Sequence, residues 1–148
     1  MIHPISALVV FLHDRYDEKR QRAEACAKAY PPPWEIADRG SNARIFADPL
    51  PLRDYPGETF VPVVVELDQH NAPGGAWLSE HLDHIAHLDP ATVLADLQSK
   101  RAIADRCARI ALDTTSDPDA AELAEDTLRD LALPFHAHED YREEWQPQ

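Results

Sequence analysis

The chain has 148 residues and carries 14 lysines and arginines against 27 aspartates and glutamates, a formal net charge of −13 at pH 7. This length predicts one domain with one core, and the charge argues against direct binding to a nucleic-acid backbone or an anionic membrane. No run of about 18 apolar residues occurs, so no transmembrane helix is predicted. The start of the chain lacks the basic leading region of a signal peptide, which predicts a cytoplasmic protein.

An amphipathic helix is predicted over residues 6–30, with Ser6 as its N-terminal cap. Its apolar side chains recur at the spacing of one helical face, and charged side chains occupy the rest. The apolar set is Leu8, Phe11, Leu12, Tyr16, Ala23, Cys26, Ala27 and Tyr30. The three prolines at positions 31–33 end the helix, because proline cannot donate a backbone hydrogen bond and restricts the residue before it.

The pattern changes to short strands over residues 34–67. Residues 34–36 alternate between apolar and polar side chains, and residues 43–47 form a second strand after a turn rich in glycine, serine and asparagine. Residues 48–57 contain several prolines and predict a loop without strand or helix. Residues 59–67 are β-branched and apolar and predict the strongest strand, with Pro62 at an edge or an irregularity.

A long helix is predicted to start at Asp89-Pro90 and to end near Leu112, after a short helix over residues 77–88. Aspartate accepts a hydrogen bond from a free amide of the first helical turn, and proline at the first helical position loses no useful donor. The apolar residues that follow recur at helical spacing and cover one broad face. This helix is therefore the expected structural centre of the chain.

The last helix has Ser116 or Asp117 as its cap, and Pro134 ends it. The helical region therefore spans residues 77–133, and residues 1–148 are interpreted as a single domain. The predicted fold class is α+β, with about three to four helices packed on a small, mostly antiparallel sheet of about three strands.

The tail, residues 134–148, contains Phe135, Tyr141 and Trp145. Three aromatic side chains are too many for a disordered segment, so part of the tail is expected to dock on the body of the protein. Tyr141 and Trp145 are therefore candidate docking residues.

Lys100 falls near the middle of the apolar face of the long helix, and Asp96 lies one turn before it. The simpler interpretation is that the stem of Lys100 covers apolar surface while its ammonium group reaches Asp96. The alternatives are a buried ion pair that fixes how two elements dock, or a lysine inside a pocket.

Histidines concentrate in two short stretches of the chain. In the first, His81, His84 and His87 recur every third residue, so neighbours share a helical face; in the second, two alternating histidines point the same way if the segment is extended. A tail folded over the short helix would bring both pairs to one divalent metal. The candidate ligands are His84, His87, His136 and His138, with a carboxylate from Asp83, Asp89 or Asp140. No HExxH or paired CxxC motif is present, so the expectation is no cofactor, with the metal as the alternative.

Two blocks of sequence carry a resemblance to a known family. They are HIAHLDPATVLADLQSKRAI, from His84 to Ile103, and LALPFHAHEDYREEW, from Leu131 to Trp145. They resemble the signature blocks of small uncharacterised proteins of actinobacteria and their phages, grouped as a domain of unknown function. The residues that carry it are His84-Ile85-Ala86, Asp89-Pro90, Val93-Leu94, Lys100-Arg101, Leu131 to Pro134 and Tyr141 to Trp145. The resemblance implies a cytoplasmic protein of an actinobacterial cell or its phage, and no activity.

No catalytic motif is present, because the chain has neither a G-x-S-x-G elbow nor a glycine loop that could bind a phosphate or a dinucleotide. The leading hypothesis is a non-catalytic cytoplasmic module that binds another protein or a second copy of itself. One alternative is a metal-binding protein or a metal-dependent hydrolase that uses the histidines.

A second alternative is an acidic decoy, in which a row of carboxylates imitates nucleic-acid phosphates and occupies a DNA-binding host protein. An ordinary solvated helix face gives the same pattern. The carboxylates concerned are Asp113, Asp117, Asp119, Glu122, Glu125, Asp126 and Asp130.

Overall fold

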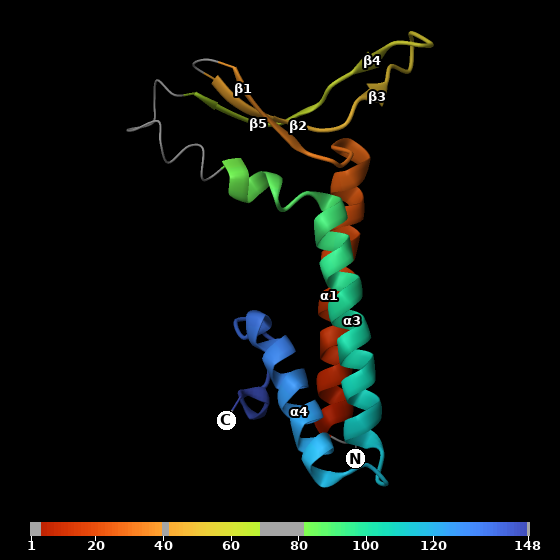
Figure 1. Ribbon diagram of the computed structural model, residues 1–148, viewed down its shortest axis with the longest axis vertical. Helices are drawn as coiled ribbons and strands as arrows, with labels where there is room; N and C mark the ends of the chain where they lie inside the picture. The colour runs from red at the N-terminus through yellow and green to blue at the C-terminus, as the bar shows by residue number, and fades with distance from the viewer. Residues whose placement is uncertain (1–3, 40–41, 69–81, 148) are drawn as a thin grey trace. The chain divides into compact units, whose positions relative to one another are not determined.

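The computed structural model describes residues 4–39, 42–68 and 82–147 (Figure 1). Its residues form two compact units: a helical unit of residues 1–20 and 96–148, and a sheet unit of residues 21–95. The architecture is α+β, as the sequence predicts, with long helices and a small antiparallel sheet. His81 and the first residues of the short helix predicted over 77–88 lie outside the described residues.

Helix α1 runs from Pro4 to Ala29 and contributes residues to both units. The helix starts three residues, or nearly one turn, before the position that a cap at Ser6 predicts. Proline suits this first turn, where a backbone donor has no partner to lose. The helix ends before the prolines as predicted, and its last turn closes with a bond of 2.8 Å from the Tyr30 N–H to the Cys26 carbonyl. Across the described residues, no helix is both long and apolar enough to cross a membrane.

Three strands of the sheet unit form one antiparallel sheet in the order β1-β2-β5. The strands are β1 (Glu35–Arg39), β2 (Asn42–Phe46) and β5 (Val63–Asp68). Ile36 lies opposite Ile45, and Ile45 lies opposite Val65, so these three side chains share one face of the sheet. The predicted three-stranded antiparallel sheet is confirmed.

A second, two-stranded ladder joins β3 (Leu50–Pro51) to β4 (Thr59–Phe60). The prediction of a loop without strand over residues 48–57 is therefore wrong in part, since Leu50 pairs with Phe60. The predicted single strand over residues 59–67 is divided at Pro62, which has no N–H to continue a ladder. The Pro62 carbonyl still accepts a 3.0 Å bond from the Ala47 N–H, which holds the break beside β2.

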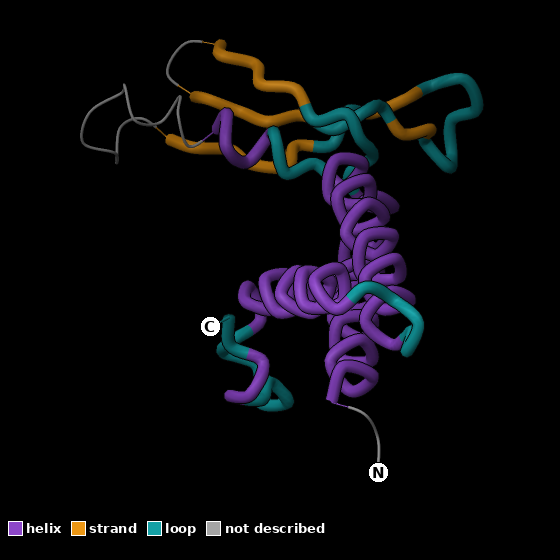
Figure 2. The backbone as a smooth tube through the Cα atoms, turned by 60° about the horizontal axis from the view of Figure 1, so that its bottom comes forward, coloured by secondary structure: helices purple, strands orange, loops and turns teal. Residues whose placement is uncertain are grey.

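The core of the sheet unit lies where residues 82–86, which are helical, cover one face of the sheet (Figure 2). Leu82 and Ile45 are both buried and form its centre. The partly buried residues around them are Trp34, Val64, Val65, Ile85 and Ala86. Since Ile36 shares a face with Ile45, the side of β1 that carries Ile36 is the side toward this helical turn.

Helix α3 runs from Pro90 to Leu112 and helix α4 from Pro118 to Ala132. The predicted starts are confirmed: Asp89 Oδ1 accepts a 2.9 Å bond from the Thr92 N–H, and Asp117 is the N-cap residue of α4. Two short 3₁₀ turns follow, at Leu133–Phe135 and Glu143–Trp145.

Two polar contacts join α1 to α3 inside the helical unit, where the two helices lie side by side (Figure 1). Arg101 Nη1 lies 2.6 Å from Asp17 Oδ1, and His13 Nε2 lies 2.8 Å from Asp105 Oδ1. The hydrogen bond from Arg101 holds the pKa of the Asp17 carboxyl below its usual value. The buried apolar residues of this unit are Ile5, Leu8, Phe11, Leu12, Tyr16, Leu97, Ala104, Ala108, Ala124, Leu128, Ala132 and Trp145.

Tyr16 provides a test of this core at high pH. Burial, with a smaller contribution from the Asp96 carboxylate, raises the pKa of Tyr16 to about 12. The folded value lies above the unfolded value of about 10, so the fold favours the neutral phenol, and that stability is lost as the pH rises from 10 towards 12. We expect the loss to reach about 1 kcal/mol by pH 11. Urea unfolding at pH 9 and pH 11 should show it in the wild type and a smaller decrease in Tyr16→Phe; equal decreases would contradict the assignment.

Candidate functional site

The predicted metal ligands divide between the two units: His84 and His87 belong to the sheet unit, and His136 and His138 belong to the helical unit. His87 Nδ1 lies 2.7 Å from the Asp83 carbonyl oxygen, and His136 Nδ1 lies 3.1 Å from the Leu133 carbonyl oxygen, so each ring is oriented by its own turn. Within residues 4–39, 42–68 and 82–147, no group of three or more His, Cys, Asp or Glu side chains is arranged to hold a metal ion. The metal site stays a prediction.

Lys100 reaches Asp96 at the surface of α3. Its Nζ atom lies 2.7 Å from Asp96 Oδ2, and the two side chains are 43% and 53% exposed. Exposed pairs at this spacing on a helix contribute less than about 1 kcal/mol. Lys100 is therefore a surface side chain in a local ion pair, and it neither fixes the docking of two elements nor lies in a pocket.

Tyr141 and Trp145 dock on α1 through the ring of Phe11. The ring centroids of Phe11 and Trp145 lie 5.0 Å apart, and those of Phe11 and Tyr141 lie 5.9 Å apart. Trp145 is buried, and Phe135 meets the same ring edge-on at 6.2 Å. The segment of residues 133–147 is therefore part of the folded helical unit, as its aromatic content predicts.

The sequence interpretation missed Arg15, which is buried at 8% exposure beneath this segment. Its Nη1 atom lies 2.8 Å from His138 Nδ1, and its Nη2 atom lies 2.9 Å from Glu18 Oε1. A buried guanidinium needs such partners, because an unpaired one loses its hydration without compensation. The signal was present in the sequence: Arg15 falls at helical spacing after Leu8 and Leu12, on the apolar stripe.

Four buried polar atoms around the docked segment have no hydrogen-bond partner among the described residues. They are Arg15 Nε, Tyr16 Oη, Tyr141 Oη and Trp145 Nε1. These atoms are covered from solvent, although Arg15, Tyr141 and Trp145 also line an open hollow of about 440 Å³ between α1 and the segment. The segment is therefore held on α1 by its aromatic rings, while most of its polar side chains stay exposed.

The acidic row of α4 is partly neutralised within its own helix. Arg129 lies 2.8 Å from Asp126 and 3.3 Å from Glu125, measured between their nearest nitrogen and oxygen atoms. Two of the predicted phosphate-like carboxylates are thus already paired. The decoy alternative stays a prediction.

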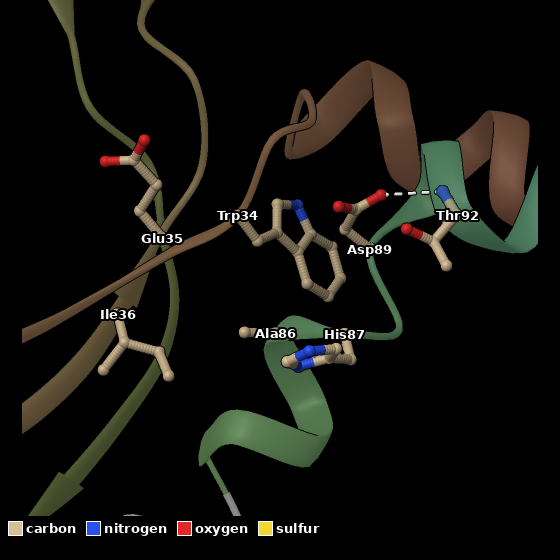
Figure 3. A pocket seen from close by; sticks show the side chains of 7 residues that line it. All are labelled: Trp34, Glu35, Ile36, Ala86, His87, Asp89 and Thr92. Atoms are coloured by element: carbon tan, nitrogen blue, oxygen red, sulfur yellow. Dashed lines mark hydrogen bonds between the residues drawn. The ribbon is translucent and has the colours of Figure 1, made fainter.

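Two hollows of the sheet unit lie at the start of β1. A hollow of about 540 Å³ lies on the side of the sheet toward the helical turn, and we call it the helix-side hollow (Figure 3). It is lined by Trp34, Glu35, Ile36, Ala86, His87, Asp89 and Thr92. Figure 3 shows the Trp34 indole directed toward the turn that carries Ala86 and His87, and the indole N–H donates to the Tyr30 carbonyl at 3.0 Å.

A second hollow, of about 500 Å³, shares Glu35 and Ile36 with the first, and we call it the open-side hollow. It is lined by Pro33, Glu35, Ile36, Phe46, Ala47, Asp48, Pro49 and Val61. Glu35 lies opposite Phe46 in the ladder and so points to the face away from Ile45. The residues that line the open-side hollow are mostly apolar, and the two carboxylates among them, Glu35 and Asp48, are exposed.

Both hollows combine apolar side chains with carboxylates. Glu35 borders both hollows, and Asp89 supplies a carboxylate on the helix side, where one of its oxygens caps α3. This combination suits an apolar group that carries a basic group beside it, since the apolar part loses contact with water while the basic part meets opposite charge. We call β1 with the two hollows the β1 edge site.

A family model described as "Family of unknown function (DUF6221)" matches residues 5–147. The chain belongs to this family. The resemblance seen in the two sequence blocks is therefore confirmed at the level of the family. A search of curated proteins and a search of solved structures each returned no match. In this DUF6221 protein, the block from His84 to Ile103 supplies His87, Asp89 and Thr92 to the helix-side hollow, so the site includes part of the sequence that marks the family.

Proposed function

We propose that this protein acts by binding another protein in the cytoplasm rather than by catalysis, and that the partner docks at the β1 edge site. One observation supports this: large apolar side chains stand exposed at the β1 edge site and beside it. Val61 lines the open-side hollow and is 48% exposed, its neighbour Phe60 is 45% exposed, and Ile36 on the helix side of β1 is 38% exposed. Exposed apolar groups that gather beside a hollow are typical of interaction sites.

The charges around the site favour a basic partner over a second copy of the same chain. Glu35 and Asp48 are exposed beside the open-side hollow, and the whole chain carries a net charge of −13. Two copies meeting here would bring carboxylates together at a cost in electrostatic energy, whereas lysines or arginines would be attracted. The family resemblance implies a partner from an actinobacterial cell or its phage.

Selection from a displayed random-peptide library tests the proposal without a known partner. We expect the enriched peptides to be rich in lysine and arginine. Their affinity should be at least about tenfold lower for Val61→Lys, because this substitution places a positive charge, the same as that of the peptides, in the open-side hollow. The matched control is Leu123→Lys, at a side chain 69% exposed in the helical unit, which should bind as the wild type does.

Two results would contradict the proposed function. One is that selection on the wild-type protein enriches no peptides other than those that selection on Val61→Lys also enriches. The other is a set of enriched peptides whose affinity falls equally in both lysine variants, which would indicate attraction to overall charge. Circular dichroism of both variants shows whether each retains its fold.

A further inference from the structure

We infer that the partner binds as an added β-strand along β1 and presents alternating apolar and basic side chains. This inference rests on the proposed function and specifies how the β1 edge site is used. β1 pairs with β2 alone among the described strands, so the backbone groups on its other side are not used by the sheet. An exposed strand edge of this kind is a template for an extended segment of another chain.

Among the described strands, β5 is the other edge of the sheet, but both hollows lie beside β1. Glu35 and Ile36 line both of them, and no residue of Val63–Asp68 lines either. A strand added beside β1 gains side-chain contacts in addition to backbone hydrogen bonds. A strand added beside β5 would gain the backbone bonds with neither hollow.

Glu35 and Ile36, which line both hollows, point to opposite faces of the sheet, and this sets the pattern of the partner. Ile36 lies opposite Ile45, which packs on Leu82, whereas Glu35 lies opposite Phe46 on the other face. Successive side chains of a strand point to opposite faces, so neighbouring residues of an added strand enter different hollows. Each pair of adjacent residues in the partner strand therefore places one side chain in each hollow.

The lining of each hollow indicates which side chain it takes. The open-side hollow offers Phe46, Val61 and two prolines to an apolar side chain. The helix-side hollow offers Asp89 and the Trp34 ring to a basic side chain, through opposite charge and a cation–π contact. The expected partner segment thus alternates β-branched residues with lysine or arginine over the length of β1.

Four synthetic octapeptides, each with four valines, four lysines and the same charge, test this pattern. The first alternates valine and lysine, and the second places four valines before four lysines. The third and fourth are the alternating peptide with N-methyl groups on one or the other alternate set of backbone nitrogens. Each carries a fluorophore, and binding is followed by fluorescence polarisation. The alternating peptide should bind at least about tenfold more tightly than the block peptide, because only alternation fills both hollows.

N-methylation separates strand addition from other modes of binding. Only every second N–H of the peptide faces β1, so methyl groups on one alternate set should abolish binding while those on the other set should leave it within about twofold. Two-dimensional amide spectra should place the shifted signals in Glu35–Arg39. The protein itself is unchanged in this experiment, so a failure to fold cannot produce the result.

The outcomes distinguish the inference from the proposed function. If library peptides depend on Val61 but the alternating and block peptides bind equally, or both N-methyl sets are tolerated, strand addition is wrong and the proposed function stands. If neither library nor synthetic peptides bind, both are wrong. If sedimentation shows a dimer that Val61→Lys dissociates, the edge binds a second copy, and the basic partner is wrong.

Discussion

Replacing Trp145 by alanine should destabilise the helical unit by about 3–5 kcal/mol. Trp145 is 4% exposed, and its ring contacts both Phe11 and Tyr141. Truncation would remove the largest apolar group of the docked segment and leave a cavity that its neighbours cannot fill without moving. Urea unfolding followed by circular dichroism at 222 nm measures the change, since this signal comes mainly from the helical backbone.

Trp145→Phe is the matched control for this prediction. Phenylalanine keeps an aromatic ring and removes the indole N–H, which has no hydrogen-bond partner among the described residues. Losing a buried, unpartnered donor offsets part of the lost packing, so this variant should cost less than about 1.5 kcal/mol. Equal losses in the two variants would mean that the docked position of Trp145 is wrong, as would no loss in either.

Replacing Ile45 by alanine should cost about 2–5 kcal/mol in the sheet unit. Ile45 has no exposed surface and packs against Leu82 at the centre of this unit's core. It also lies on the central strand, so its truncation weakens contacts to β1 and β5 together. Urea unfolding again measures the change.

The neighbouring isoleucine is a control on the same face of the same sheet. Ile36 lies directly opposite Ile45 but is 38% exposed, so Ile36→Ala should cost less than about half as much. The pair separates burial from β-propensity, because both substitutions replace isoleucine by alanine in a strand. Similar losses at the two positions would show that propensity, and not the Leu82 contact, stabilises the unit.

The helices could be predicted from sequence because their signals are local. Asp89-Pro90 supplies a hydrogen-bonding cap and a first-turn proline to α3, and Asp117-Pro118 occupies the same two positions in α4. The pair of Asp96 and Lys100 is likewise separated by one turn of one helix. Each of these features depends on residues at most four positions apart.

The candidate site could not be predicted in the same way. The edge position of β1 follows from the order of strands, and the pairing of Leu50 with Phe60 joins residues across a loop. Neither the strand order nor this pairing can be predicted from residues that are close together in the sequence. Arg15 lies between these cases: its place on an apolar stripe is visible in the sequence, but its partner His138 is 123 residues away.

The four buried polar atoms without partners have a consequence for local opening of the helical unit. When residues 133–147 detach, Trp145 loses its apolar contacts, but Arg15 Nε and the Tyr141 hydroxyl regain hydrogen bonds to water. The free energy needed to lift this segment is thus smaller than its aromatic contacts alone indicate. Detachment of the segment can therefore precede global unfolding as a separate sub-global event, with α4 still in place.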